Sequence, residues 1–80
     1  MTELILYGRA GCHLCDEMKA DLLALRPPLE FHLTEVAVGW EGALAEKYGR
    51  LVPVLEMAGQ EVCHYFLDEE RLRAALGRVF

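Results

Sequence analysis

Two cysteines near the start of the 80-residue chain, Cys12 and Cys15, have the type and spacing of residues that could do chemistry. His13 and Leu14 stand between them, and the apolar run at residues 4–7 (LILY) comes shortly before them. A helical pattern of apolar residues starts at about His13. Two cysteines three residues apart, placed between a strand and a helix, are typical of a redox-active dithiol.

The two thiols are expected to differ in reactivity because they would lie one turn apart at the start of a helix. Cys12 would face solvent and the free backbone N–H groups of the first turn, whose partial positive charge lowers a thiol pKa below its ordinary value of about 8.5. Cys15 would be more deeply buried, yet near enough to form a disulfide. We therefore expect Cys12 to be the nucleophile and Cys15 to resolve the mixed disulfide. Arg9 and His13 could each add positive charge beside Cys12, or be exposed polar side chains without a role.

A metal site and a structural disulfide are the alternative interpretations of this pair. Zinc needs four ligands, and the chain has no second pair of cysteines, so Cys63 and the three histidines would have to meet in the folded chain. A disulfide that closes so short a loop removes little entropy from the unfolded state. The flanking strand and helix therefore favour redox chemistry. Cys63 is expected to be a small buried strand residue and not a third redox group.

Length and charge limit the classes of protein to which the chain can belong. Eighty residues allow one domain, residues 1–80, and 54% hydrophobic with 26% charged residues is an ordinary globular composition. The net charge of −5 and the scattered Lys and Arg residues argue against nucleic-acid binding. No apolar stretch is long enough to cross a membrane. The chain starts without a signal-peptide pattern and its three cysteines do not suit a secreted disulfide scaffold, so we expect a cytoplasmic protein.

Hydrophobic periodicity and turn residues predict the order strand, helix, strand, helix, strand, strand, helix. The strands are expected at residues 3–7, 29–36, 51–57 and 61–65, and the helices from about 13 to the prolines at 27–28, from 40 to 48, and from Asp68 onward. Apolar side chains at helical spacing should face the core: Met18, Leu22 and Leu25, with Leu14 and Leu23 widening that stripe, then Leu44, Ala45 and Tyr48, then Leu72, Ala75, Leu76 and Val79. Asp68 should cap the last helix.

Three positions predict local irregularities, and a fourth, Trp40, needs an interpretation of its own. The alternation of apolar and polar residues slips at residues 34–35, so the second strand should end or bulge there. Gly42 weakens the second helix. Pro53 cannot donate a ladder hydrogen bond and should stand at an edge, a strand start or a bend. Trp40 is interpreted as a packing residue in preference to a substrate platform.

The element order, the cysteine pair after the first strand and the Val-Pro pair at the third strand resemble the thioredoxin fold in its minimal, glutaredoxin-sized form. More narrowly, the chain is similar to a family of short bacterial glutaredoxin-like proteins. The matching motifs are residues 11–17 (GCHLCDE), 48–49 (YG), 52–55 (VPVL) and 68–72 (DEERL), and the likeness extends over essentially the whole chain. It implies an α/β fold with a four-stranded mixed sheet and helices on both faces.

The resemblance also implies substrate-binding residues around the cysteines. In this fold the proline of the Val-Pro pair is cis and lies beside the cysteines, so Val52 and Pro53 would present backbone to an extended substrate that docks as an added strand. Arg9 stands where glutaredoxins often have a lysine, and Asp68 and Glu69 align with acidic residues that bind the amino end of glutathione. The expected substrate-binding set is completed by the two residues between the cysteines, His13 and Leu14.

Two departures from the glutaredoxin pattern bear on glutathione. Glutaredoxins commonly have Pro-Tyr between the cysteines and a Gly-Gly pair before the last helix, where the backbone approaches glutathione; this chain has Tyr65-Phe66 at about that place. Asp68 would use the N–H groups of the last helix as its cap and would add negative charge beside an anionic tripeptide. We therefore expect weak glutathione binding and better reduction by a dithiol system.

The leading hypothesis is a small thiol–disulfide oxidoreductase in which Cys12 attacks a substrate disulfide and Cys15 resolves the mixed disulfide. The alternatives are a non-catalytic thioredoxin-fold binding module and an iron–sulfur cluster carrier. The expected partners are a disulfide-containing protein or glutathione as substrate, and a reductase. We expect a monomer with no metal, and no cofactor other than its own disulfide and, as the alternative, glutathione.

Overall fold

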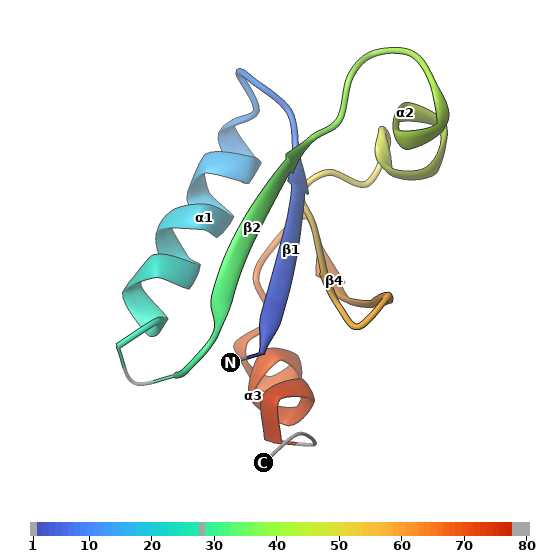
Figure 1. Ribbon diagram of the computed structural model, residues 1–80. Coiled ribbons are helices and arrows are strands. Elements are labelled where there is room, and N and C mark those ends of the chain that lie inside the picture. The colour runs from blue at the N-terminus through green and yellow to red at the C-terminus, as the bar shows by residue number, and fades with distance from the viewer. Residues whose placement is uncertain (1, 28, 78–80) are drawn as a thin grey trace.

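A single mixed sheet organises the chain. The computed structural model describes residues 2–27 and 29–77. Its elements are β1 (Glu3–Gly8), α1 (His13–Leu25), β2 (His32–Ala37), α2 (Ala43–Tyr48), β3 (Val54–Met57), β4 (Gln60–His64) and α3 (Glu69–Gly77), as Figure 1 shows. The strand order is β2-β1-β3-β4; β1 and β2 are parallel, and the other neighbouring pairs are antiparallel. The predicted element order and four-stranded mixed sheet are confirmed.

The main core lies between the sheet and the helices α1 and α3. It joins leucines of β1 and β3 to the inner faces of the two helices, and its buried members are Leu4, Leu6, Met18, Leu22, Phe31, Leu55, Val62, Cys63, Leu72, Ala75 and Leu76. The main helical stripes predicted for α1 and α3 are therefore confirmed, with Leu14 and Leu25 partly buried. The predicted widening of the α1 stripe by Leu23 is wrong, because Leu23 is 44% exposed. Val79, also expected on the α3 stripe, lies outside the described residues.

A second, smaller core lies on the opposite face of the sheet, under α2. Tyr48 of α2 packs with Val38 and Val54, and its ring stacks on that of Tyr7 with centroids 4.0 Å apart. The Tyr48 hydroxyl donates to the buried carboxylate of Glu56 at 2.6 Å. Helices thus cover both faces of the sheet, as expected. No helix within the described residues is long and apolar enough to span a membrane.

The second strand differs from its prediction. It begins at His32, three residues later than expected, and pairs with β1 in an unbroken register as far as Ala37, so the predicted bulge at residues 34–35 is wrong. Successive side chains of β2 still point to alternate faces of the sheet. Glu35 lies on the α1 side at the sheet edge, where Lys19 pairs with it at 3.1 Å. Thr34 points to the opposite face and donates to Glu3 at 2.8 Å.

The second helix is shorter than expected. It begins at Ala43 because Gly42 has φ of 101°, a left-handed conformation that a helix cannot include. Trp40 therefore lies in the preceding loop and is 77% exposed, so its interpretation as a packing residue is wrong. Leu44 is also exposed, at 40%, and does not face the core as predicted.

The hairpin of β3 and β4 explains the position of Pro53. Strand β3 begins at Val54, three residues later than predicted, so Pro53 precedes the ladder. The Val52–Pro53 peptide bond is cis in the structure. Ala58 and Gly59 both have positive φ, 52° and 79°, as a tight two-residue hairpin turn requires. The sheet's register shift falls in this hairpin and not in β2.

Candidate redox site

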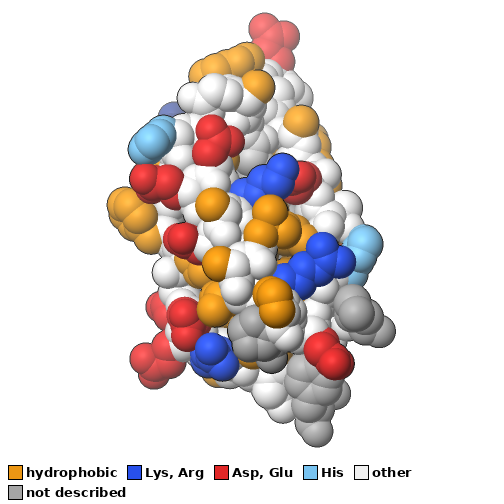
Figure 2. All heavy atoms as spheres, turned by 90° about the vertical axis from the view of Figure 1, so that its left-hand side faces the viewer, with side chains coloured by type: hydrophobic (Ala, Val, Ile, Leu, Met, Phe, Trp, Pro, Cys, Tyr) orange, Lys and Arg blue, Asp and Glu red, His pale blue; other side chains and the backbone are white. Residues whose placement is uncertain are grey.

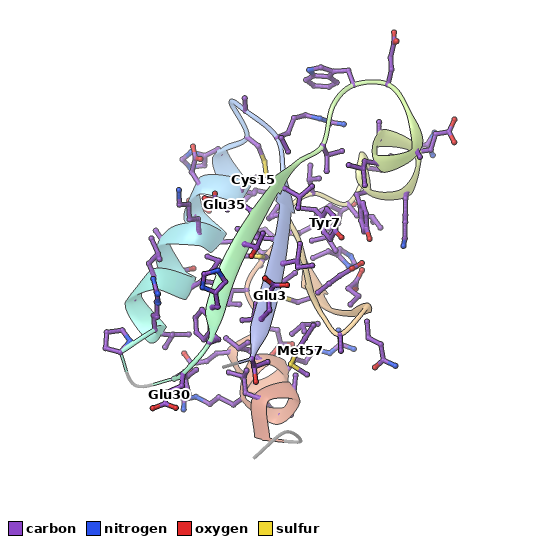
Figure 3. All side chains as sticks on the ribbon, viewed as in Figure 1. Glu3, Tyr7, Cys15, Glu30, Glu35 and Met57 are labelled. Atoms are coloured by element: carbon purple, nitrogen blue, oxygen red, sulfur yellow. A yellow bond between two sulfur atoms is a disulfide. The ribbon has the colours of Figure 1, made fainter. Side chains whose placement is uncertain are left out.

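Cys12 and Cys15 lie at the N-terminal end of α1 and are joined by a disulfide, with their Cα atoms 5.2 Å apart. Cys12 is the N-cap residue, with extended backbone angles, and Cys15 is the third residue of the helix. Figure 3 shows Cys15 at the end of α1 next to the end of β1. The pair predicted from the sequence is therefore brought together by the strand–loop–helix unit that was expected to hold it.

The two sulfur atoms have different surroundings. Cys12 is partly exposed, and its Sγ accepts a hydrogen bond from the backbone N–H of Cys15 at 3.1 Å. Cys15 is only 7% exposed. A Cβ atom added at Gly8 would come within 3.3 Å of both Cβ and Sγ of Cys15, so the glycine leaves the space into which Cys15 packs. The accessible sulfur is thus the one that the helix N–H groups face.

The other residues of the loop motif point to solvent or to neighbours other than the sulfurs. The His13 imidazole is 86% exposed and pairs with Glu17 one turn further along α1, at 3.1 Å from its Nε2. Leu14 is partly buried. In this arrangement His13 is directed along the helix, toward Glu17.

Arg9 connects the cysteine loop to the segment around α2. Its guanidinium donates to the carbonyl oxygens of Gly39 (3.1 Å) and Gly49 (3.2 Å), and lies 4.0 Å from the centroid of the Trp40 ring. Its backbone carbonyl accepts the N–H of Cys12 at 3.2 Å. The side chain that was expected beside the thiol or a substrate therefore makes its contacts with other loops.

The strand register places Val52 and Pro53 at the same end of the sheet as the cysteines. Tyr7 pairs with Val54, so the residue before Val54 and the residue after Tyr7 are neighbours across the two strands. Pro53 is buried and Val52 is partly exposed. The N–H of Val52 already donates to the carbonyl of Tyr48 at 3.0 Å. No backbone hydrogen bond to the Val52 carbonyl is present among the described residues, so this carbonyl is the group of Val52 that could accept one from a docking strand.

Tyr65 and Phe66 follow β4 at this end of the sheet. Tyr65 has φ of 65°, a conformation that favours glycine. It is held there by three contacts: its N–H donates to Pro53 O (2.9 Å), its hydroxyl donates to Arg50 O (2.8 Å), and its ring meets His64 edge-on. Phe66 is 67% exposed. The bulky pair thus borders the 50–53 loop.

Asp68 caps α3, as predicted. Its Oδ1 accepts the backbone N–H of Arg71 at 3.0 Å, and Glu69 and Glu70 occupy the first turn. The Arg73 guanidinium pairs with Glu69 at 2.9 Å. Asp68 therefore has a structural role at the helix start.

Cys63 is the free cysteine of the described residues and lies in β4. It is 3% exposed, as expected for a small strand residue in the core. Burial raises the pKa of its thiol, which disfavours the reactive thiolate.

A pocket of about 240 Å³ lies beside the buried cysteine. It opens between the start of α1 and the edge strand β2, and its lining residues are Leu6, Gly8, Arg9, Ala10, Cys15, Asp16, Lys19, Glu35, Val36 and Ala37. Figure 2, which views the molecule from the α1 side, shows more acidic than basic side chains on that face, in keeping with the net charge of −5.

The sequence did not reveal the contacts of Arg9 or the pair formed by Tyr48 and Glu56. The Arg9 bonds go to distant backbone carbonyls, which carry no side-chain signature. Tyr48 and Glu56 belong to a helix and a strand, so no single periodicity relates their positions. A glutamate in an otherwise apolar strand, residues 54–57, was the one available signal for a buried polar partner.

A mixed four-stranded sheet with a Cys-x-x-Cys pair at the start of its first helix defines a protein of the thioredoxin fold, in the small form typical of glutaredoxins. The family model described as glutaredoxin-like domain (DUF836) matches residues 3–77, and the chain belongs to this family. Uncharacterized proteins of Mycobacterium tuberculosis and Mycobacterium bovis are 34% identical to it, over 91% of this chain and 80% of theirs.

Solved structures of similar proteins agree with this assignment. The solution structure of protein Ne2328 from Nitrosomonas europaea superimposes with a TM-score of 0.83 at 39% identity, covering 92% of this chain and 89% of that one. The crystal structure of target protein XcR50 from X. campestris gives a TM-score of 0.69 at 38% identity, covering 94% of this chain and 96% of that one.

Proposed function

We propose that this protein is a thiol–disulfide oxidoreductase that uses Cys12 and Cys15 as a dithiol. The supporting observation is the asymmetry of the pair: Cys12 is accessible and accepts the N–H of Cys15 at 3.1 Å, while Cys15 is buried. Backbone N–H groups and the helix dipole stabilise negative charge on the sulfur they face. After reduction of the disulfide, Cys12 is therefore the thiol that ionises readily and meets a substrate.

The reaction proceeds by two exchanges. The Cys12 thiolate attacks one sulfur of a substrate disulfide, an S–S bond forms between Cys12 and the substrate, and the other substrate sulfur leaves as a thiolate that takes up a proton. Cys15 then loses its proton and attacks Cys12 Sγ, which releases the second substrate thiol. The substrate gains two electrons and the protein is left with the Cys12–Cys15 disulfide. A dithiol reductant restores the starting state.

The substrate is proposed to dock beside the Val52–Pro53 segment. The Val52 N–H is used within the chain, so the contact is one hydrogen bond to the Val52 carbonyl and not a full strand pairing. Leu14 and the exposed Phe66 offer apolar surface around the same end of the sheet. These features favour a protein disulfide as substrate.

Glutathione is proposed to be a poor substrate. Tyr65 and Phe66 stand where glutaredoxins use glycines to let glutathione approach the backbone, and Tyr65 is hydrogen-bonded across to Arg50. Asp68 uses a helix N–H that could otherwise meet a carboxylate, and the net charge is −5. We propose that a protein dithiol reduces the Cys12–Cys15 disulfide, and that the protein works as a cytoplasmic monomer.

Turnover by single-cysteine variants tests the proposal. The wild type should reduce a peptide disulfide with a dithiol as reductant, Cys12→Ser should be inactive, and Cys15→Ser should stop at a mixed disulfide visible by mass spectrometry. Cys63→Ser is the matched control and should keep the activity. Efficient turnover of glutathione mixed disulfides by Cys15→Ser would contradict the dithiol mechanism. Absence of any turnover would favour the binding-module alternative.

A further inference from the structure

Trp40, the single tryptophan of the chain, is exposed but held in place. Its side chain is 77% exposed in the loop before α2. The Arg9 guanidinium lies 4.0 Å from the ring centroid and is itself fixed by hydrogen bonds to the carbonyls of Gly39 and Gly49. An aromatic side chain held in one position loses little conformational freedom when a ligand packs on it. Trp40 is thus a preorganised surface.

Trp40 is also one of the residues that line an open groove. The groove has a volume of about 550 Å³, lies between the 39–42 loop and α2, and is lined by Trp40, Glu41, Gly42, Ala45, Glu46 and Arg50. Arg9 is not among the lining residues. Arg9 therefore contacts Trp40 without lining the groove itself.

The charges of the groove favour a cation next to the indole. Glu41 and Glu46 are exposed and form no ion pair within residues 2–27 and 29–77. The electron-rich face of an indole attracts ammonium and guanidinium groups, and Arg9 already makes such a contact on this ring. Arg50 adds positive charge to the lining, so a bound cation would lie toward the two carboxylates. The net charge of −5 favours the approach of a basic partner.

The groove lies close to the redox pair. The loop that carries Cys12 and the loop that carries Trp40 leave the parallel strands β1 and β2 at the same end of the sheet, as Figure 1 shows. Arg9 joins them, because its backbone carbonyl accepts the N–H of Cys12 while its side chain lies on Trp40. A partner that occupies the groove would have its neighbouring residues near Cys12.

We propose that the groove between Trp40 and α2 binds a lysine or arginine side chain of the protein whose disulfide exchanges with Cys12. The identity of that partner rests on the proposed function, whereas binding of the cationic side chain does not require the dithiol. The two parts can therefore be tested apart.

The binding part is tested with the single tryptophan as the probe. In a Cys12→Ser, Cys15→Ser protein, the fluorescence of Trp40 is followed while the blocked peptide Gly-Arg-Gly-Arg-Gly is added, and the same peptide with Glu in place of Arg is the control. A saturable change with the arginine peptide is expected, weakened about tenfold by Glu41→Gln with Glu46→Gln and by added salt. The matched control, Asp21→Asn with Glu30→Gln, changes the net charge equally and should bind as the parent does. An equal response to both peptides, or a preference for the acidic one, would overturn the inference.

The exchange part is tested with two peptide disulfides that differ only in flanking Arg or Glu residues. The wild type should reduce the arginine peptide with a kcat/KM about tenfold higher than that for the glutamate peptide. The ratio of the two kcat/KM values should fall toward one in the Glu41→Gln, Glu46→Gln variant. It should stay the same in the Asp21→Asn, Glu30→Gln control. Reduction of both peptides at equal rates would overturn the docking inference and leave the proposed function standing. Reduction of neither peptide would overturn the proposed function, and the fluorescence titration would still decide whether the groove binds the cation.

Discussion

Cys12, Cys15 and Cys63 have three different surroundings within one small chain. Cys12 is accessible at the N-cap of α1, Cys15 is packed against Gly8 three residues later, and Cys63 lies in the core of the sheet. The reactivity of a thiol depends on its fraction of thiolate and on the access of the reagent. The three cysteines should therefore differ in their rates of alkylation.

After reduction, iodoacetamide at neutral pH should label Cys12 first, Cys15 more slowly, and Cys63 only when the protein is unfolded. The helix N–H groups stabilise the Cys12 thiolate, whereas burial raises the pKa of the Cys63 thiol and keeps it protonated. Mass spectrometry of peptides taken over time measures the order. Labelling of Cys15 before Cys12 would reverse the proposed roles, and labelling of Cys63 at the rate of Cys12 would contradict its burial.

Between elements, Gly49 is the position at which α2 meets the cysteine loop. It ends α2, and its carbonyl accepts a hydrogen bond from Arg9 at 3.2 Å. A Cβ atom at this position would collide with the carbonyl oxygen of Ala45 and come within 3.0 Å of Arg9 Nη2. The close approach of the two loops therefore depends on a residue without a side chain.

Gly49→Ala should destabilise the protein by about 1–3 kcal/mol and loosen the contact between Arg9 and Trp40. Urea unfolding measures the first effect, and the emission maximum of the single tryptophan measures the second. Gly77→Ala is the matched control, because nothing lies within 4 Å of a Cβ there; it should be neutral or slightly stabilising in α3. Equal stability of the two variants would show that the 49 position tolerates a side chain.

A buried hydrogen bond also ties α2 to the sheet. Tyr48 is 5% exposed and donates to Glu56, which is 8% exposed. Tyr48→Phe would leave this carboxylate without its donor, which should cost about 1–3 kcal/mol. Tyr65→Phe is the matched control, since the Tyr65 hydroxyl bonds a carbonyl at an exposed site, and it should cost about 1 kcal/mol or less. Urea midpoints of the two variants measure the difference, and a smaller loss for Tyr48→Phe would contradict the role of the buried pair.

For the molecule as a whole, the oxidised protein should lose stability at alkaline pH. Burial, and then the hydrogen bond to Glu56, raise the pKa of Tyr48 above its ordinary value, and burial raises the pKa of Cys63. Each group keeps its proton to higher pH in the folded than in the unfolded protein. The contribution of each group to stability is complete below its pKa in the unfolded protein, about 8.5 for Cys and about 10 for Tyr. It is lost as the pH rises through the pKa of the group in the folded protein.

Unfolding free energies measured in urea from pH 7 to 11 should therefore be flat at first, fall above about pH 9 and fall more steeply above about pH 10, by up to about 1.4 kcal/mol per unit for each group. Tyr48→Phe should remove the steeper part, although it starts from a lower stability. A stability that is constant or rises to pH 11 would contradict this account.

Local patterns by themselves determined the element order, the redox pair and most of the main core. The Cys12–Cys15 unit could be predicted because a strand, a glycine turn and a helix start are all local features. Met18, the inner leucines of α1 and α3, and the Asp68 cap follow from helical spacing and short-range hydrogen bonds in the same way.

Tertiary structure decided what depends on residues distant in the chain. Glu35 breaks the apolar alternation of the sequence, but it keeps its place in β2 because Lys19 of α1 pairs with it. The sequence favours packing for Trp40, whereas the φ of Gly42 starts α2 after it and leaves the indole exposed against Arg9. The Arg9 guanidinium donates to carbonyl oxygens of other loops. Because every residue has a backbone carbonyl, the sequence does not indicate which of them Arg9 will bind. Periodicity predicts which face of a helix or strand a residue occupies. The atoms that the residue contacts there come from distant parts of the chain, so only the tertiary structure identifies them.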